Sequence, residues 1–80
     1  MDIGAQISIY PLRQEHLSPT IEALRSALEA AALQPIVGPM STTVRGNPEV
    51  VFAALREAFV QAMQRGAVVM TVTFSNACPI

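Results

Sequence analysis

Near its C-terminus the chain reads Gly66-Ala67-Val68-Val69-Met70-Thr71-Val72-Thr73-Phe74-Ser75-Asn76-Ala77-Cys78-Pro79. From Val68 to Phe74 every second residue is apolar, and small residues, most of them with hydroxyl groups, lie between. Such alternation is typical of a β-strand, because successive side chains point to opposite faces. Pro79 has no N–H to continue a ladder. The stretch predicts a strand with one apolar and one hydroxyl-lined face, followed by polar groups on irregular backbone.

Length and composition predict a single domain, residues 1–80, that associates with copies of itself. A chain of 80 residues buries only roughly 60–65% of the surface that it exposes when unfolded. Hydrophobic residues make up 51% of the chain and charged residues only 14%, which is too few charges to cover an isolated small domain. We therefore expect a homo-oligomer in which part of the surface meets another subunit.

Charge and cysteine content exclude several classes of protein. The net charge is −1 and the isoelectric point is near 5.6, without a Lys/Arg cluster of the kind that binds the phosphates of nucleic acid. One cysteine excludes an internal disulfide. The N-terminus lacks the features of a signal peptide, and the apolar runs are too short to cross a bilayer. We expect a cytoplasmic protein with no membrane insertion.

Residues 4–10 repeat the alternating pattern and predict a first strand, closed by Pro11. A helix follows, with Ser18 as its N-cap and Pro19 at its first position. We expect this helix to end near Leu33. Its buried residues are predicted from their helical spacing to be Ile21, Leu24, Leu28 and Ala31 or Ala32.

Residues 34–46 leave room for a short hairpin. Ile36 and Val37 predict its first strand and Thr42 to Arg45 its second, with turn residues Gly38-Pro39-Met40-Ser41 between them. A second helix then starts with Asn47 as N-cap and Pro48 at its first position. Its predicted buried residues are Val51, Leu55, Ala58, Phe59 and Ala62, flanked by Phe52 and Met63.

The second helix is predicted to end at Arg65-Gly66, with a cation in its last turn and a left-handed glycine. The order strand, helix, strand, strand, helix, strand then predicts an α+β, ferredoxin-like βαββαβ fold: an antiparallel four-stranded sheet with two helices on one face. The first and third strands are central. The fourth is a long, uncharged edge that invites pairing with a neighbour. The open face is hydroxyl-rich and carries Gln6, Ser8, Tyr10, Thr71 and Thr73.

No catalytic or metal-binding constellation stands out. Cys78 and His16 are the only thiol and the only imidazole, and a Cys–His enzyme also needs an orienting group and an oxyanion hole. Metal ligands with recognisable spacing and a glycine-rich phosphate loop are missing from the sequence. We expect a protein that is not an enzyme, with no catalytic residue, metal or cofactor. An enzyme that uses Cys78 remains the alternative.

Some polar and aromatic side chains are candidates for binding a small molecule. Asn76 offers a donor and an acceptor side by side, which complements the edge of an aminopyrimidine, but it can equally stabilise a turn at the end of a strand. Tyr10 can stack on a flat or cationic ring or lie in a subunit interface. Ser41 and Thr42 supply hydroxyls from the hairpin.

Several segments resemble the YkoF-like family, whose members are described as binding thiamine and its hydroxymethylpyrimidine moiety. The resemblance covers essentially the whole chain, and its most specific parts are Gly38-Pro39-Met40-Ser41-Thr42 and Ser75-Asn76-Ala77-Cys78-Pro79. The other parts are Ile7-Ser8-Ile9-Tyr10-Pro11-Leu12, Val37, Gly46, Val51-Phe52-Ala53-Ala54-Leu55-Arg56-Glu57-Ala58-Phe59 and Val69-Met70-Thr71-Val72-Thr73-Phe74.

The resemblance implies an ACT-like domain that binds thiamine or hydroxymethylpyrimidine without converting it, in vitamin B1 salvage or uptake beside a transporter. Its motif positions give a candidate site of Tyr10, Met40, Ser41, Thr42, Ser75, Asn76 and Cys78. The founding type has two such repeats in one chain, so a homodimer is implied here. The pocket opens on either the helix side or the open sheet face. The alternative function is a homo-oligomeric regulatory module with another ligand or none.

Overall fold

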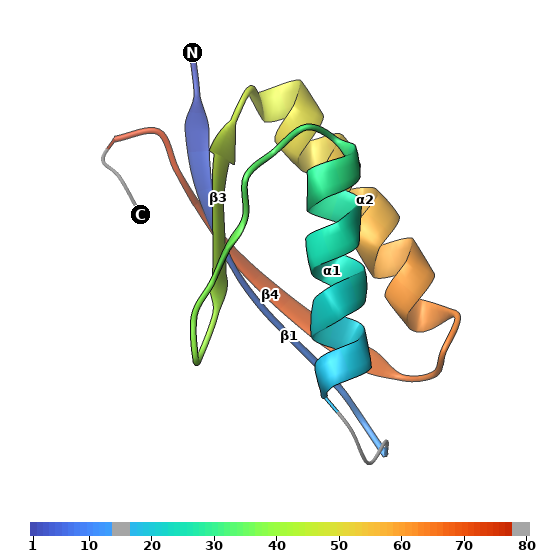
Figure 1. Ribbon diagram of the computed structural model, residues 1–80. Helices are drawn as coiled ribbons and strands as arrows, with labels where there is room; N and C mark the ends of the chain where they lie inside the picture. Colours follow the sequence, from blue (N-terminus) through green and yellow to red (C-terminus); the bar gives the residue numbers. More distant parts are fainter. Residues whose placement is uncertain (14–16, 78–80) are drawn as a thin grey trace.

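The computed structural model describes residues 1–13 and 17–77. It shows the predicted order of elements, with both helices on one side of the sheet (Figure 1). The elements are β1 (Ile3–Pro11), α1 (Ser18–Ala30), β2 (Ile36–Val37), β3 (Thr42–Gly46), α2 (Pro48–Met63) and β4 (Val68–Ser75). The α+β, ferredoxin-like prediction is confirmed.

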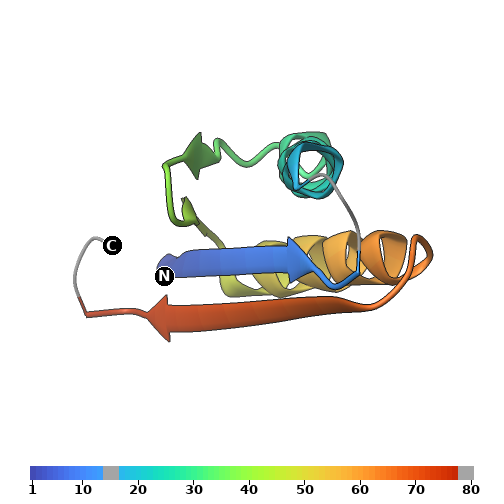
Figure 2. The ribbon, with the colours of Figure 1, turned by 90° about the horizontal axis from the view of Figure 1, so that it is seen from below.

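The sheet is antiparallel and has the strand order β2-β3-β1-β4. The first and third strands are therefore central, as predicted, and Figure 2 shows β1 and β4 running side by side along their length. Register places Ile7 of β1 opposite both Thr42 of β3 and Val72 of β4. Since opposite residues point to the same face, the apolar sides of these strands all meet the helices.

The start of α1 differs from the prediction that Ser18 is its N-cap. Leu17 precedes the helix with helical backbone angles, and its carbonyl accepts hydrogen bonds from the N–H groups of Thr20 (3.1 Å) and Ile21 (3.2 Å). Ser18 is therefore inside the first turn and makes no side-chain cap. An N-cap residue needs extended backbone, which Ser18 does not have here.

The end of α1 also comes earlier than predicted, at Ala30 instead of near Leu33. The N–H of Leu33 donates to the Leu28 carbonyl (3.1 Å), and the N–H of Ala32 donates to the Glu29 carbonyl (3.0 Å). This pair of bonds is a Schellman motif, which requires a left-handed residue after the helix. Ala32 takes that conformation, with φ 63°, although glycine adopts it at lower cost.

The start of α2 confirms the prediction, but its end does not. Asn47 is extended, and its Oδ1 accepts a hydrogen bond from the Glu49 N–H at 2.9 Å. The helix ends at Met63, so Arg65 lies beyond the last turn, where its guanidinium donates to the Pro19 carbonyl at 3.1 Å. Gly66 has φ 137°, a positive value but not the left-handed helical one that was expected.

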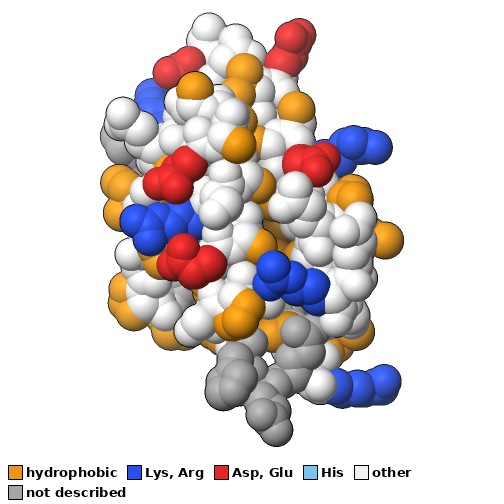
Figure 3. All heavy atoms as spheres, turned by 45° about the vertical axis from the view of Figure 1, so that its right-hand side comes forward, with side chains coloured by type: hydrophobic (Ala, Val, Ile, Leu, Met, Phe, Trp, Pro, Cys, Tyr) orange, Lys and Arg blue, Asp and Glu red, His pale blue; other side chains and the backbone are white. Residues whose placement is uncertain are grey.

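The core lies between the sheet and the helices and is made of small and branched side chains. Its fully buried members include Ile7 of β1, Leu24 and Leu28 of α1, and Val51 of α2. Ala31 and Phe59, two of the predicted core residues, are only half-buried. Figure 3 shows charged side chains over the helices, with hydrophobic atoms between them.

The opposite sheet face is open and mostly uncharged, as predicted. Gln6 lies opposite Thr73, and Ser8 lies opposite Thr71. Arg45 also lies on this face, because it is paired with Gly4, and the sequence analysis did not place it there. None of the helices in residues 1–13 and 17–77 is long and apolar enough to cross a membrane.

The strained cap of α1 predicts a stabilising substitution. Ala32→Gly is expected to raise the free energy of unfolding by about 0.5–1 kcal/mol, because the left-handed backbone costs an alanine about 1–2 kcal/mol and part of the gain is lost to the greater freedom of glycine when unfolded. Urea or thermal denaturation followed by circular dichroism measures the change.

The matched control is Ala53→Gly, at an exposed position inside α2. This change is expected to lower the free energy of unfolding by about 1 kcal/mol, as for glycine in any helix interior. Destabilisation by Ala32→Gly of similar size would show that the backbone at residue 32 is not left-handed in solution.

Candidate functional site

Beyond Ile7 the central strand β1 loses its neighbour on one side. Residues Ile3 to Ile7 pair with β3, whereas pairing with β4 continues from Gly4 to Pro11. Within residues 1–13 and 17–77, no strand therefore lies beside Ser8, Ile9 and Tyr10 on the edge that faces away from β4. Backbone N–H and C=O groups need hydrogen-bond partners, so this short edge is suited to bind a polar ligand.

A pocket of about 220 Å³ opens at this edge. Its walls come from β1, the hairpin that joins β2 to β3, and the beginning of α1, and its lining residues are Ile7, Ser8, Ile9, Tyr10, Leu17, Ile21, Gly38, Pro39, Met40, Ser41 and Thr42. Two levels can be distinguished. Ile7 and Thr42 are buried at the base, whereas Tyr10, Leu17 and Met40 are exposed at the rim.

Hydrogen bonds attach the hairpin to β1 beside the pocket. Gln6 Nε2 donates to Ser41 Oγ (3.2 Å), and Ser8 Oγ donates to the Met40 carbonyl (3.3 Å). Within the hairpin the Gly38 N–H donates to the Ser41 carbonyl at 2.8 Å. The two serines that line the pocket are thus held in place by residues that the chain separates by more than 30 positions.

The described lining has the chemistry of a site for a neutral, partly aromatic molecule. It combines the hydroxyls of Ser8, Ser41 and Thr42 with aliphatic walls and one aromatic ring, and its described members carry no charge. Apolar walls with a few convergent polar groups are the usual composition of small-molecule pockets. Tyr10 is 46% exposed, and an aromatic side chain at the rim of a pocket is suited to stack on a flat ring.

The structure brings together four of the seven predicted site residues, namely Tyr10, Met40, Ser41 and Thr42. Ser75 lies opposite Gly4, at the other end of β1. Tyr10 is six positions along β1 from Gly4, so Ser75 is about 20 Å from the pocket at about 3.3 Å per strand residue. Within one chain, Ser75 and Asn76 form a separate group.

The Ser75 group has its own local contacts. Ser75 Oγ accepts a hydrogen bond from the Ala77 N–H at 3.1 Å, so Ser75 stabilises the turn at the end of β4, a role that was expected of Asn76. Asn76 Nδ2 lies 4.0 Å from the sulfur of Met1. Cys78, the seventh candidate, and His16 lie outside the described residues.

Sequence reasoning missed Ser8, Leu17 and Ile21 as pocket residues. Ser8 had been placed on the open sheet face, and Ile21 in the core. Their shared role depends on where β3 ends relative to β1, which no local sequence pattern shows. The neighbouring position of Ser8 and Tyr10 on one face was the one available signal.

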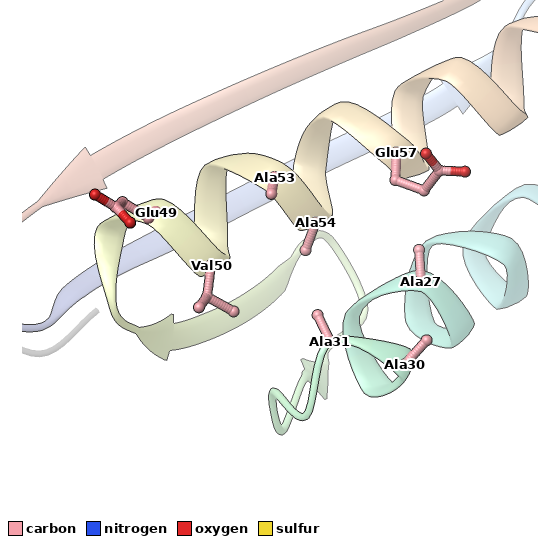
Figure 4. Close-up of a pocket in the computed structure, with 8 residues that line it drawn as sticks. All are labelled: Ala27, Ala30, Ala31, Glu49, Val50, Ala53, Ala54 and Glu57. Carbon is pink, nitrogen blue, oxygen red and sulfur yellow. The ribbon is translucent and has the colours of Figure 1, made fainter.

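A second hollow, of about 460 Å³, lies between the two helices. Figure 4 shows that alanine side chains from both helices line it, with Glu49 and Glu57 on α2. The hollow arises because alanines leave space between the helices. It contains none of the predicted site residues. Within residues 1–13 and 17–77 no group of three or more metal-ligating side chains occurs.

Comparisons with known proteins identify the family to which the chain is similar. The model of the YKOF-related family matches residues 2–80. A search of curated proteins finds no significant match.

Solved structures share the fold. Protein MJ1052 of Methanocaldococcus jannaschii superposes with a TM-score of 0.87 at 19% identity, over 96% of this chain and 81% of that one. Protein SP2199 of Streptococcus pneumoniae gives 0.86 at 21% identity, over 98% and 89%. Protein TM0486 of Thermotoga maritima, provisionally assigned to thiamine biosynthesis or salvage, gives 0.81 at 19% identity, over 94% and 83%.

At such identities the structural matches show only a common fold. The classification of the chain therefore depends on the family match. It extends over almost the whole chain and agrees with the resemblance seen in the motifs around Met40 and Asn76. The chain belongs to the YKOF-related family.

Proposed function

We propose that this protein binds hydroxymethylpyrimidine, free or as part of thiamine, in the pocket beside Ser8, Ile9 and Tyr10, and releases it unchanged. The observation that carries the proposal is the pocket itself, which brings together four of the seven site residues implied by the resemblance. The relation of a structural neighbour to thiamine salvage supports the same class of ligand.

The size of the pocket favours a single ring. Its volume of about 220 Å³ is below the about 300–1,000 Å³ that is usual for drug-sized ligands. A hydroxymethylpyrimidine ring is one flat heterocycle, whereas thiamine carries a second ring. We therefore propose that the pyrimidine enters the pocket and that the thiazolium of thiamine remains at the rim.

The polar groups of the pocket suit an aminopyrimidine. Such a ring presents a donor and an acceptor side by side, and hydroxyls can serve as either. Ser8, Ser41 and the unpaired edge of β1 offer groups of this kind at one wall. The lack of charge in the described lining also favours a neutral ring, because an unpaired charge is costly to move away from water.

The setting of this function is also a proposal. The protein acts in the cytoplasm in vitamin B1 salvage or uptake, in association with transporter components, and it works as a homodimer. Membership of the YKOF-related family and the thiamine-related neighbour support a vitamin-related role. The large hydrophobic fraction and low charge of the chain support self-association.

Isothermal titration calorimetry with hydroxymethylpyrimidine and then with thiamine tests the ligand. Saturable binding of one molecule per chain is expected. Tyr10→Ala is expected to weaken binding by about two- to tenfold, the loss of an aromatic stacking contact of about 0.5–1.5 kcal/mol, whereas Tyr10→Phe keeps the ring and most of the affinity.

The control for this titration is Thr73→Ala, an exposed position on the same sheet face that does not line the pocket. Its affinity is expected to equal that of the wild type. Absence of heat with both ligands would contradict the proposed function. Equal affinities of Tyr10→Ala and the wild type would show that the ligand does not bind beside Tyr10.

The non-catalytic part of the proposal has a separate test. Thiamine and hydroxymethylpyrimidine incubated with the protein are expected to be recovered unchanged when the solution is analysed by liquid chromatography and mass spectrometry. The described side chains of the pocket offer no carboxylate, imidazole or amine for acid–base chemistry. A new product that forms in proportion to protein concentration would show that the protein is an enzyme.

A further inference from the structure

We propose that the groove between α1 and α2 is a docking site for an amphipathic helix of another protein, one that carries lysines or arginines beside its apolar face. This interhelical groove has a volume of about 460 Å³. Its apolar floor, its negative charge and the spacing of its carboxylates lead to this assignment. It shares no lining residue with the pocket beside Ser8, Ile9 and Tyr10, so the inference does not depend on the proposed function.

The floor of the interhelical groove is made mostly of alanine methyl groups. Five of its eight lining residues are alanines, which come from both helices (Figure 4), and Val50 adds an exposed aliphatic side chain. The distance between two packed helix axes depends on the side chains at the contact, so alanines allow a further helix to approach closely. An amphipathic helix that lays its apolar face into an apolar groove is a recurring mode of recognition.

The interhelical groove is negatively charged. Glu49 and Glu57 line it, and its described lining includes no cation. Glu57 accepts a hydrogen bond from Gln61 Nε2 at 3.0 Å. Within residues 1–13 and 17–77 the only ion pairs are those of Arg25 with two glutamates of α1 outside the groove lining. Both carboxylates of the groove can therefore pair with cations of a partner.

The helix dipoles add to this charge. α1 and α2 run in opposite directions (Figure 1), so the C-terminal end of α1 lies beside the N-terminal end of α2. A helix C-terminus has partial negative charge, and the last turn of α1 has no basic residue to offset it. The positive N-terminus of α2 already has Glu49 in its first turn. A cation is thus favoured at this end of the groove, beside Ala31 and Val50.

The two carboxylates have a spacing that a helix can match. Glu49 and Glu57 are eight positions apart on α2, which is about 12 Å along the helix axis at about 1.5 Å per residue. A partner helix that lies alongside α2 has the same rise, so two of its cations that are seven or eight residues apart can meet both carboxylates. The apolar side chains between these cations then contact the alanines.

Other occupants fit the interhelical groove less well. Small-molecule sites contain a few convergent polar groups that fix the orientation of the ligand, whereas the side chains here offer only apolar groups between two distant carboxylates. A second copy of this chain is also unsuitable. Each of its helices contains a single cation, Arg25 in α1 and Arg56 in α2, so neither helix can meet both carboxylates.

Fluorescence anisotropy with a labelled model peptide tests the proposal. The probe is a synthetic helix of about five turns, with leucines on one face and lysines seven residues apart beside them. It is expected to bind saturably, and more weakly at high salt because exposed ion pairs are screened. The same peptide with glutamate in place of lysine is expected not to bind. Failure of the lysine peptide to bind, or equal binding of both peptides, would overturn the proposal.

Glutamine substitutions show whether the two carboxylates of the groove are responsible. The double variant Glu49→Gln/Glu57→Gln is expected to bind the lysine peptide about two- to thirtyfold more weakly, the range for the loss of two exposed ion pairs. The matched control Glu22→Gln/Glu29→Gln removes the same charge from α1, outside the groove lining, and is expected to bind as the wild type does. Equal weakening by both double variants would show attraction by net charge alone and contradict docking in the groove.

A substitution inside the interhelical groove separates docking from folding. Ala30→Lys places a cation at an exposed position of the lining and is expected to weaken binding at least as much as the glutamine pair, by repulsion and by filling the groove. In the last turn of α1 the same lysine interacts favourably with the helix dipole. The thermal unfolding midpoint is therefore expected to stay the same or to rise. Unchanged binding by this variant would exclude the groove as the docking site.

Amide shifts of the ¹⁵N-labelled protein, titrated with the lysine peptide, give the position of the peptide. They are expected around Ala27, Ala30 and Ala54. Shifts concentrated at Phe52 and Phe74, a second exposed apolar surface, would show that the peptide binds there and that the proposal is wrong. Hydroxymethylpyrimidine and thiamine are absent from these measurements, so their outcome and that of the calorimetry are independent.

Discussion

The backbone of β1 has to find hydrogen-bond partners along two edges, and the two neighbouring strands provide them over different lengths. β4 accompanies β1 from Gly4 to Pro11, whereas β3 accompanies it only from Ile3 to Ile7. This difference in pairing length determines where the core and the pocket lie along β1. The doubly paired half of β1 carries Ala5 and Ile7 of the core, and the singly paired half, which adds Ile9 to the core, forms a wall of the pocket.

The helices cover the two halves of β1 differently. Ile21 and Leu17, at the start of α1, close the pocket on the helix side, while Leu24 and Leu28 pack in the core. α2 covers β4 incompletely, and Phe52 and Phe74 stay exposed side by side. One small domain thus has a mostly apolar pocket with a few hydroxyl groups on one side of β1 and an apolar margin along β4.

Much of the fold was predictable because its signals are local. Alternation gave the long strands, and Asn47-Pro48 gave the start of α2. The start of α1 was predicted wrongly because Leu17 has helical angles and leaves Ser18 inside the first turn. The turn at Ala32 was missed because a left-handed alanine has no sequence signal comparable to glycine.

The site was only partly predictable, because its assembly depends on register. Family motifs identified Tyr10, Met40, Ser41 and Thr42, which the fold brings together. The separation of Ser75 from Tyr10 follows from the predicted topology itself, since the end of an antiparallel last strand lies beside the start of the first. The contribution of Ser8 required knowledge of where pairing with β3 stops.

The most direct test of the central claim is an NMR titration of the ¹⁵N-labelled protein with hydroxymethylpyrimidine. If the singly paired half of β1 forms the binding site, saturable amide shifts will concentrate at residues 8–10 and 38–42 and at the start of α1. Shifts confined to the groove between the helices around Ala27 and Ala54, or to residues 3–6 of β1, would contradict the account.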